Sequence, residues 1–332
     1  MLKQTMNLKA NNTLRLPALV DNFYAVSSVI QLKEALQQTT DPIILGEGSN
    51  VVLAKASYAD VIALQLKGIE LVDEDDEAFY VKAAAGENWH QFVLYCIEHD
   101  YFGIENLSLI PGTVGAAPVQ NIGAYGVELK DVFYELEALD RNSLEMKIFD
   151  KNSCQFSYRN SLFKSTARDE YIITAVTLRL AKQPNFVLGY PTLQEKLKDY
   201  DGAISAKAIS DAVCAVRRSR LPDPAEIGNV GSFFMNPVVD KAALDGLLAK
   251  HPELVYFDMG DRQYRVPAAQ LIKLCGFTDI NHDGIGVYEK NAIVLVNQGE
   301  GTGEAVLHFT KKIQSAVKDR FDIDIHPEPR IY

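Results

Sequence analysis

The feature that most constrains the fold is a long stretch, residues 103–129, that is rich in glycine and free of charge. No charged residue lies between Glu105 and Glu128, and small residues are frequent there. Glycine has no Cβ, so it tolerates positive φ and lets peptide N–H groups approach a ligand closely. The stretch therefore favours a backbone wrapped around a large uncharged ring system or, as an equally open alternative, a buried loop that serves packing alone.

A second glycine-rich turn, residues 46–50, follows the apolar run 43–45, which is typical of a buried strand. Peptide N–H groups that converge in such a turn can hold a pyrophosphate. The turn lacks the third glycine of a dinucleotide fingerprint, and it lacks the Gly-Lys-Ser/Thr of a P-loop. Taken alone, it is more typical of a tight turn than of a phosphate site.

Length and charge exclude several classes of protein. The chain has 332 residues, enough for two or three domains, because single cores stop growing near about 250 to 300 residues. The net charge of -11 argues against bulk nucleic-acid binding. The cysteines (Cys96, Cys154, Cys214 and Cys275) are too scattered for a zinc site or a disulfide framework, so we expect free thiols and no metal. No run is apolar enough for a signal region or a membrane span, so we expect a cytoplasmic protein.

Hydrophobic periodicity predicts short strands interspersed with a few helices. Helices are expected at 29–36, 89–97, 205–218, 241–250 and 304–320, with an apolar stretch at 268–275; strands are expected at 43–45, 51–53, 61–66, 79–85, 132–139, 144–149, 170–180, 292–297 and 321–326. The acidic run 73–77 is expected to be a solvated turn. The pattern favours an α+β protein over a regular βαβ alternation, with a boundary at the basic, proline-containing segment 217–224.

Five segments along the chain form an ordered set of motifs: 45–52, 110–126, 157–159, 231–237 and 326–330. They occur in the order seen in the UDP-N-acetylenolpyruvoylglucosamine reductase (MurB) family, which the chain resembles over nearly its whole length. The resemblance implies a two-lobed FAD-binding body of the vanillyl-alcohol-oxidase (PCMH) type, with one lobe at 1–68 and 320–332 and the other at 69–219. A C-terminal α+β substrate-binding domain would follow at 220–319. Residues 189–191 resemble the tyrosine loop that distinguishes one subtype of the family.

Three residues in these segments could carry chemistry. Ser232 has no Gly-x-Ser-x-Gly elbow around it, and a lone serine is typical of a turn hydroxyl. Glu328 lies between two prolines, each of which fixes φ, so its carboxylate sits on a stiff backbone, although a glutamate so near a terminus is usually solvated. Arg159 could form a structural salt bridge or clamp a substrate carboxylate.

The resemblance implies that Ser232, Glu328 and Arg159 form a reduction centre. The family reduces the enolpyruvyl ether of UDP-N-acetylglucosamine to UDP-N-acetylmuramate for peptidoglycan synthesis, with hydride from N5 of a flavin that NADPH has reduced. Hydride addition β to a carboxylate creates an enediolate, which Arg159 and a protonated Glu328 would stabilise while Ser232 protonates the α-carbon. The chain has no Rossmann fingerprint for NADPH, which fits a ping-pong scheme in a single cleft.

The resemblance also implies two sets of binding residues. Non-covalent FAD would be held by Gly46, Glu47, Gly48, Ser49, Asn50, Ile110, Pro111, Gly112, Thr113, Gly115, Ala116, Gln120, Asn121, Gly123, Ala124 and Ile173. The substrate would be held by Tyr125, Tyr158, Tyr190, Arg217, Arg220, Asn236 and Asn291. Arg217 and Arg220 could instead stabilise the C-terminus of their own helix. We expect a monomer that binds UDP-GlcNAc-enolpyruvate and NADPH and has neither nucleic acid nor a membrane as a partner.

Two other functions stay open. The chain could be an oxidase or dehydrogenase of the same fold with another substrate, or a catalytically silent flavoprotein or nucleotide-binding module. The pairing of Ser232 with Glu328 argues against the first, and their presence together with Arg159 argues against the second. Arg220 replaces a lysine that is usual in the family, and Tyr288 stands where histidine is common. Residues 12–15 also depart from the usual motif. We expect the change at Arg220 to leave catalysis intact and the other two to alter only local contacts.

Overall fold

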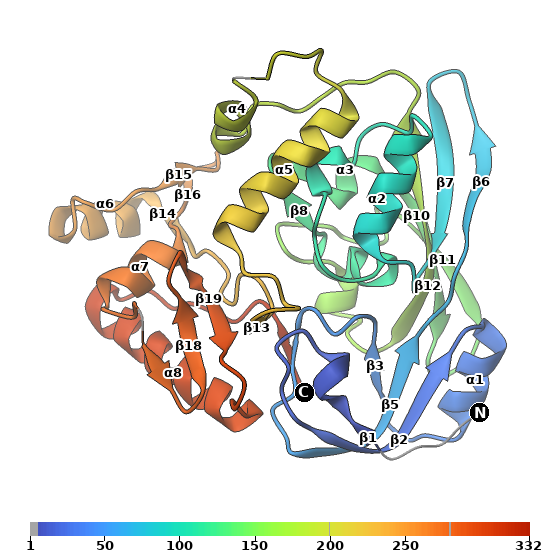
Figure 1. Ribbon diagram of the computed structural model, residues 1–332, viewed down its shortest axis with the longest axis horizontal. Helices are drawn as coiled ribbons and strands as arrows, with labels where there is room; N and C mark the ends of the chain where they lie inside the picture. The colour runs from blue at the N-terminus through green and yellow to red at the C-terminus, as the bar shows by residue number, and fades with distance from the viewer. Residues whose placement is uncertain (1–5, 199, 279) are drawn as a thin grey trace. The chain divides into compact units, whose positions relative to one another are not determined.

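The structure, a computed structural model, describes residues 6–198, 200–278 and 280–332. The chain forms two compact units (Figure 1). The first unit contains residue 6, Val20–Glu47 and Ala59–Ser219; the second contains Asn7–Leu19, Gly48–Tyr58 and Arg220–Tyr332. The chain passes from the first unit to the second for the last time between Ser219 and Arg220, inside the basic, proline-containing segment 217–224. The division of the FAD-binding body into two lobes stays a prediction, and the structure groups residues 320–332 with the second unit.

The first unit is built around a five-stranded antiparallel sheet with the order β11-β10-β12-β7-β6. Its strands are β6 (Ile69–Glu74), β7 (Ala78–Ala84), β10 (Phe133–Asp140), β11 (Met146–Asp150) and β12 (Tyr171–Ala181). Helix α2 (Trp89–Glu98) packs Trp89 and Phe92 into the same core as Val81, Leu136 and Val176. The strands that were predicted at 79–85, 132–139 and 170–180 are confirmed within a residue or so.

A four-stranded sheet has the order β1-β2-β5-β3, with β1 at Met6–Asn7, β2 at Leu19–Val26, β5 at Ser57–Leu64 and β3 at Ile43–Leu45. Strands β3 and β5 are parallel, and helix α1 (Val29–Gln37) connects β2 to β3. The helix begins where the Ser28 hydroxyl accepts a hydrogen bond from the Gln31 N–H (3.2 Å), a typical N-cap. Strand β3 ends at Leu45, so it presents the glycine-rich turn at its carboxyl end.

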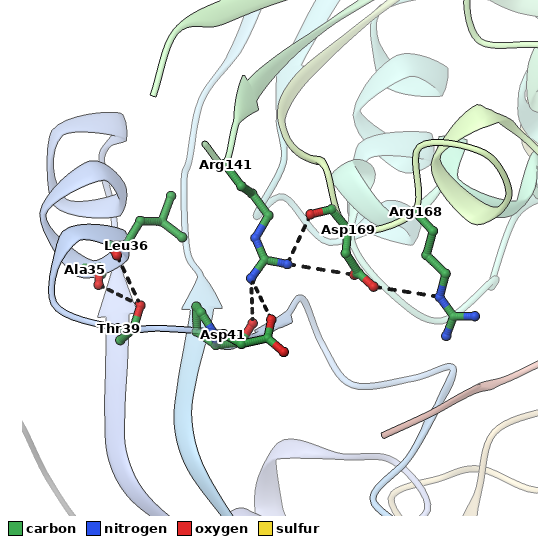
Figure 2. A network of polar contacts seen from close by, with 8 residues as sticks. Ala35, Leu36, Thr39, Asp41, Arg141, Arg168 and Asp169 are labelled. Carbon is green, nitrogen blue, oxygen red and sulfur yellow. Dashed lines mark hydrogen bonds and ion pairs between the residues drawn. The ribbon is translucent and has the colours of Figure 1, made fainter. Parts of the chain in front are cut away.

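One buried arginine fixes the loop that leads into β3, as Figure 2 shows. The Arg141 side chain, only 12% exposed, follows β10 and donates from Nη2 to Asp41 Oδ1 (3.3 Å) and to the Pro42 carbonyl (3.3 Å). Its Nη1 donates to the Asp169 carbonyl (3.3 Å), and Asp169 also lies 3.8 Å from Arg168. Arg141 therefore joins the loop before β3 to the ends of β10 and β12.

Two helices form a smaller apolar cluster in the first unit. Helix α5 (Ala206–Arg220) presents Ile209 and Val213 to Leu193 of helix α4 (Pro191–Leu197). The Ser205 hydroxyl accepts from the Ala208 N–H (3.2 Å), which confirms the predicted cap. Sequence periodicity missed α4 because it has only seven residues. Other short elements of this unit include β8 (Gly123–Ala124), β9 (Val127–Glu128), α3 (Leu129–Val132) and several 3-10 helices.

The second unit packs α7 (Ala268–Leu274) and α8 (Gly303–Phe321) against a sheet of order β13-β19-β18-β17. Its strands are β13 (Gly228–Asn229), β17 (Asn281–His282), β18 (Ile285–Tyr288) and β19 (Asn291–Asn297). A small sheet of order β14-β16-β15 accompanies α6 (Lys241–Lys250), with β14 at Val238–Asp240, β15 at Phe257–Asp258 and β16 at Gln263–Arg265. Strands β4 (Val51–Val52) and β20 (Arg330–Ile331) pair in parallel. Phe233, Phe234 and Phe309 belong to the core.

Two expectations about secondary structure were wrong. The alternating segment 321–326 is no strand: helix α8 includes Phe321, and Asp322 follows it in a left-handed conformation (φ 56°), although burial does alternate as the pattern indicated. Within the acidic run 73–77, Asp73 and Glu74 belong to the edge strand β6 rather than to a turn. Nearly all side chains of β6 are exposed, so no hydrophobic periodicity indicated this strand. No helix of the described residues is both long and apolar enough to cross a bilayer.

Candidate active site

In the first unit, a carboxylate joins the glycine-rich turn to the long glycine-rich loop. Glu47 accepts a hydrogen bond from the Gly112 N–H (2.6 Å) through Oε2 and from Asn88 Nδ2 (3.3 Å) through Oε1. Asn88 also caps α2 by accepting from the Gln91 N–H (3.1 Å). Gly112 has a φ of 118°, which favours glycine. The start of α2 and both predicted flavin segments are therefore held together by one network.

Two glycines are required where backbone segments meet. A Cβ on Gly46 would lie 2.5 Å from Thr113 Oγ1, and a Cβ on Gly115 would lie 2.5 Å from the Cβ of Ala85. Both distances are far below the ordinary carbon contact of about 3.5–4.0 Å. The small residues of the loop thus serve close packing between protein segments, which was one of the two alternatives drawn from composition. The other alternative, contact with a ring system, is compatible with this packing.

Leu109, within the glycine-rich stretch, forms hydrogen bonds through both its N–H and its carbonyl. Its φ is 58°, a left-handed conformation that is unusual for a non-glycine residue. Its N–H donates to His90 Nδ1 (3.0 Å), and its carbonyl accepts from Arg217 Nε (3.1 Å). Burial, followed by the charges of Arg218 and Arg217, lowers the pKa of His90. The neutral imidazole can accept at Nδ1 as this hydrogen bond requires.

Two guanidinium groups lie in the same region. Arg159 has a φ of 52° in the tight turn 157–160 and donates from Nη2 to the Gly123 carbonyl (2.6 Å). Burial lowers the pKa of Arg217; Tyr125 acts in the opposite direction, and the charge of Arg159 lowers it further. Like charges that approach in a partly buried place repel each other. A guanidinium can donate two parallel hydrogen bonds to a carboxylate or a phosphate, so each of these arginines has the chemistry to bind an anionic ligand.

Two tyrosines of the first unit meet each other. The rings of Tyr125 and Tyr190 are arranged edge to face, with 5.2 Å between centroids and an interplanar angle of 78°. Tyr190 is the N-terminal flanking residue of α4 and is 40% exposed. Tyr158 lies under the Arg159 guanidinium, 5.5 Å from its ring centroid. The first unit thus gathers Tyr125, Tyr158, Tyr190, Arg159 and Arg217, which the sequence analysis assigned to substrate or catalysis.

In the second unit, the backbones of the two predicted acids are joined. The Glu328 N–H donates to the carbonyl of Phe233 (2.8 Å), the residue after Ser232, and the Met235 N–H donates to the His326 carbonyl (2.9 Å). Phe233 is fully buried, whereas Ser232 is exposed. The Phe233 N–H in turn donates to the Ile293 carbonyl of β19 (2.8 Å). Ser232 therefore presents an exposed hydroxyl from a backbone that these hydrogen bonds hold in place. The backbone of Glu328 belongs to the same ladder of hydrogen-bonded segments.

The other predicted site residues of the second unit include several that make contacts within the protein. Asn50 belongs to this ladder because its carbonyl accepts from the Arg330 N–H (2.9 Å). Gly48 has a φ of 69°, and a Cβ on it would lie 2.2 Å from the Asn11 carbonyl oxygen. Asn236 accepts from the Ala268 N–H (2.9 Å) at the start of α7, so its oxygen has a structural role. Ser49, Arg220 and Asn291 complete the predicted set in this unit.

Some predicted flavin residues are engaged within the protein. The Asn121 side chain is buried, donates to Glu128 Oε2 (3.0 Å) and to the Ser157 carbonyl (3.1 Å), and accepts from the Lys130 N–H (3.0 Å). Any contact of Asn121 with a cofactor would therefore involve its backbone. Ile173 is 5% exposed within the core of the five-stranded sheet. The predicted residues Ile110, Pro111, Ala116, Gln120 and Ala124 lie in the first unit with the loop.

Sequence reasoning missed the residues that hold the loop in place. No sequence motif marks His90, Asn106 or Leu109 as a support of the loop. Asn106 belongs to no sequence motif. Only its burial (1% exposed) beside other buried polar residues distinguishes it, and burial cannot be read from the sequence. A groove of about 480 Å³ in the second unit, lined in part by Arg15, Tyr288 and Asn297, contains none of the predicted site residues.

The two glycine-rich segments fit FAD in their chemistry. An uncharged loop of small residues suits a flat ring, and a glycine-rich turn at the end of β3 suits a pyrophosphate. The carboxylate of Glu47 is already occupied by the Gly112 N–H, so it would present little uncompensated negative charge to a phosphate.

The chain is similar to known proteins along its whole length. Residues 24–146 match a family described as FAD binding domain, and residues 223–332 match one described as UDP-N-acetylenolpyruvoylglucosamine reductase, C-terminal domain. The UDP-N-acetylenolpyruvoylglucosamine reductase of Amoebophilus asiaticus is 44% identical over 335 residues, with 99% of each chain covered. That of Cupriavidus pinatubonensis is 49% identical over 287 residues, covering 86% of this chain and 85% of the relative. The crystal structure of the Thermus caldophilus enzyme covers both chains completely with a TM-score of 0.69 at 19% identity, which shows a shared fold.

Proposed function

Because the chain belongs to the UDP-N-acetylenolpyruvoylglucosamine reductase family, we propose that it reduces UDP-N-acetylglucosamine enolpyruvate to UDP-N-acetylmuramate. The reaction would serve peptidoglycan precursor synthesis in the cytoplasm, with a monomeric enzyme, non-covalent FAD and NADPH as co-substrate. The observation that carries the proposal is the hydrogen bond between the Glu328 N–H and the Phe233 carbonyl, because it fixes two candidate acids, Ser232 and Glu328, on one ladder.

The chemical problem is the negative charge that the reduction places on the substrate. Bound FAD supplies the hydride, which it takes from NADPH. The substrate then becomes an enediolate, and its stabilisation needs donors that are already oriented. Arg159 meets this need because its hydrogen bond to Gly123 and its tight turn hold the guanidinium in one place. Glu328, in its protonated form, would donate to the same charge.

The second step is protonation of the α-carbon. Ser232 is exposed on a backbone anchored by the buried Phe233 and Phe234, so its hydroxyl can meet a substrate without a change in the core. A serine is a weak acid, so it can act only on a strongly basic carbanion and with a neighbour that stabilises the alkoxide. Reprotonation of the serine from solvent would complete the turnover.

Binding the diphosphate of the substrate requires positively charged side chains and a residue that shields it from solvent. The charges of Arg159 and Tyr125 act on Arg217, the Tyr125 ring meets that of Tyr190, and a guanidinium can donate two hydrogen bonds to one phosphate group. We propose that Tyr190 closes over the diphosphate. Arg220, Asn236 and Asn291 would bind neighbouring groups of the nucleotide.

Two features support non-covalent FAD and the ping-pong order. Cys96, one of the two nearest candidates for a covalent link, is fully buried, and burial followed by the charge of Glu105 raises the pKa of its thiol well above the usual value. His90, the other, engages Nδ1 with the Leu109 N–H. The sequence contains no dinucleotide fingerprint, so NADPH and substrate would use one cleft in turn.

An anaerobic titration of the purified yellow protein tests the proposal. NADPH should bleach the flavin absorbance, and UDP-N-acetylglucosamine enolpyruvate should restore it with formation of UDP-N-acetylmuramate. If NADPH bleaches the flavin but this substrate leaves it reduced, the substrate is wrong, and an oxidase or dehydrogenase with another substrate becomes the better account. If NADPH does not bleach the flavin at all, the protein is a silent flavoprotein.

A further inference from the structure

A buried amide connects two segments that lie far apart in the sequence. Asn106, in the short 3-10 helix Glu105–Leu107, donates from Nδ2 to the carbonyl of Tyr125 (2.9 Å) and to the carbonyl of Val187 (2.8 Å). The residue is 1% exposed. Both protons of one amide are therefore used to hold the glycine-rich loop and the segment that precedes Tyr190 at a fixed separation.

The arrangement carries a cost that a purely structural residue would avoid. Asn106 Oδ1 has no hydrogen-bond partner among the residues that the structure describes, and a buried unsatisfied oxygen lowers stability. Rotating the amide would place this oxygen against two carbonyls, so the observed orientation is the only one in which both contacts are attractive. A leucine of similar shape would remove the unsatisfied oxygen, but it would also leave Tyr125 and Val187 unconnected.

The two segments that Asn106 connects carry the pair of tyrosines. Val187 lies three residues before Tyr190, and a Cβ on Gly126 would lie 3.1 Å from the Val187 Cγ1, so the segments are in contact there. The Tyr125 and Tyr190 rings then meet edge to face. Beyond Tyr190, Leu193 is fully buried in the small apolar cluster with α5. The segment is thus anchored at both ends, with the half-exposed Tyr190 between the anchors.

We propose that Asn106 is a positioning residue that sets the place of Tyr190 for binding the diphosphate of the substrate. The inference rests on the proposed function, in which Tyr190 covers that group. Asn106 fixes the loop before the substrate arrives, so less of the binding free energy is spent on ordering the loop. It does not touch the reacting atoms, so its loss acts on substrate binding and leaves the chemical step in place.

The test compares Asn106→Leu with Ser108→Ala in the FAD-loaded protein. Ser108 is equally buried and two residues away, but its hydroxyl bonds to the Glu105 carbonyl (2.7 Å) and Ser210 Oγ (2.7 Å) and touches neither tyrosine segment. Limited trypsin digestion reports on the loop because Lys196 and Lys198 are exposed near the end of α4. We expect N106L to increase cleavage at these lysines about tenfold, since two hydrogen bonds are lost, and S108A to leave it unchanged.

Steady-state kinetics provides the second readout. N106L should raise KM for UDP-N-acetylglucosamine enolpyruvate about tenfold and change kcat less than about twofold. Flavin reduction by NADPH should proceed at the wild-type rate. If N106L accumulates in insoluble form, N106A replaces it with the same expectations.

Three results are decisive. Wild-type cleavage of the Asn106 variants overturns the connection between Asn106 and the loop, whatever the substrate is. Faster cleavage with an unchanged KM overturns the role in substrate binding while the proposed function stands. If the wild-type protein does not act on the enolpyruvyl substrate, the proposed function fails and the positioning of a diphosphate fails with it, whereas the digestion still decides whether Asn106 holds the loop.

Discussion

The close approach of Gly46 to Thr113 predicts the effect of a single added methyl group. In Gly46→Ala, the new Cβ would lie 2.5 Å from Thr113 Oγ1 and 3.4 Å from Thr113 Cγ2. Threonine is β-branched, so its χ1 is restricted and Oγ1 cannot move away freely. Overpacking of this kind costs about 1–3 kcal/mol. G46A should therefore lower the free energy of unfolding by about that amount.

The same distances predict which second substitution relieves the clash. Thr113→Ala removes Oγ1 and Cγ2 and leaves the Thr113 Cβ at 3.5 Å from the new methyl group, an ordinary contact. Thr113→Val puts a methyl group in the place of Oγ1 and keeps the branched Cβ with its restricted χ1, and hence the clash. In a double-mutant cycle, G46A with T113A should recover about 1–2 kcal/mol, and G46A with T113V should recover almost none.

Urea denaturation of the FAD-loaded protein, followed by tryptophan fluorescence, measures this cycle. Trp89 is the single tryptophan of the chain and is buried in the first unit, so the signal reports on the unit that contains both substitutions. An additive cycle with T113A, or equal relief by T113V, would refute the close approach of the turn to the loop. It would also remove the main reason for assigning both glycine-rich segments to one site.

Three further predictions concern other parts of the first unit. Arg141→Met should lower the free energy of unfolding by about 1–3 kcal/mol because three backbone or side-chain acceptors lose their donor, whereas the exposed Arg168→Met should change it by less than about 0.5 kcal/mol; urea titration checks both. Burial and two neighbouring arginines lower the pKa of His90 below its ordinary 6.5, so stability present above pH 6.5 should be lost as the pH falls, and His90→Asn should flatten this decline in thermal melts from pH 8 to 5. Glu47→Gln should raise the Kd for FAD about 3–30-fold in a fluorescence titration because a charge-assisted hydrogen bond to the loop is weakened. Glu87→Gln, which alters a bond to Gly68, should leave that Kd unchanged.

The sequence predicted elements best where local signals agreed. Helix α6 begins at Lys241 with Asp240 as its cap and ends at Lys250, as the periodicity indicated. The α+β fold with an FAD-binding domain and the family membership are also confirmed. The edge strand β6 was missed because its side chains are exposed, so its partner β7 rather than its own pattern determines it.

The candidate site was predictable only in part, for a physical reason. Glycine-rich turns and the Ser232 and Glu328 motifs are continuous in sequence, so a pattern can reveal them. The supports of the site come from distant positions: His90 reaches Leu109, and Asn106 reaches Val187. Such contacts depend on how α2 and the loops pack together, and no local pattern encodes them.

Single-turnover kinetics with Ser232→Ala tests whether Ser232 protonates the substrate after hydride transfer. The control is Ser315→Ala, which removes an exposed serine of helix α8 in the same unit. Anaerobic reduction by NADPH should keep the wild-type rate in both variants. Reoxidation by UDP-N-acetylglucosamine enolpyruvate should slow by about 10²–10⁴-fold in S232A alone. Reoxidation of S232A at the wild-type rate would contradict the assignment of Ser232 as the proton donor.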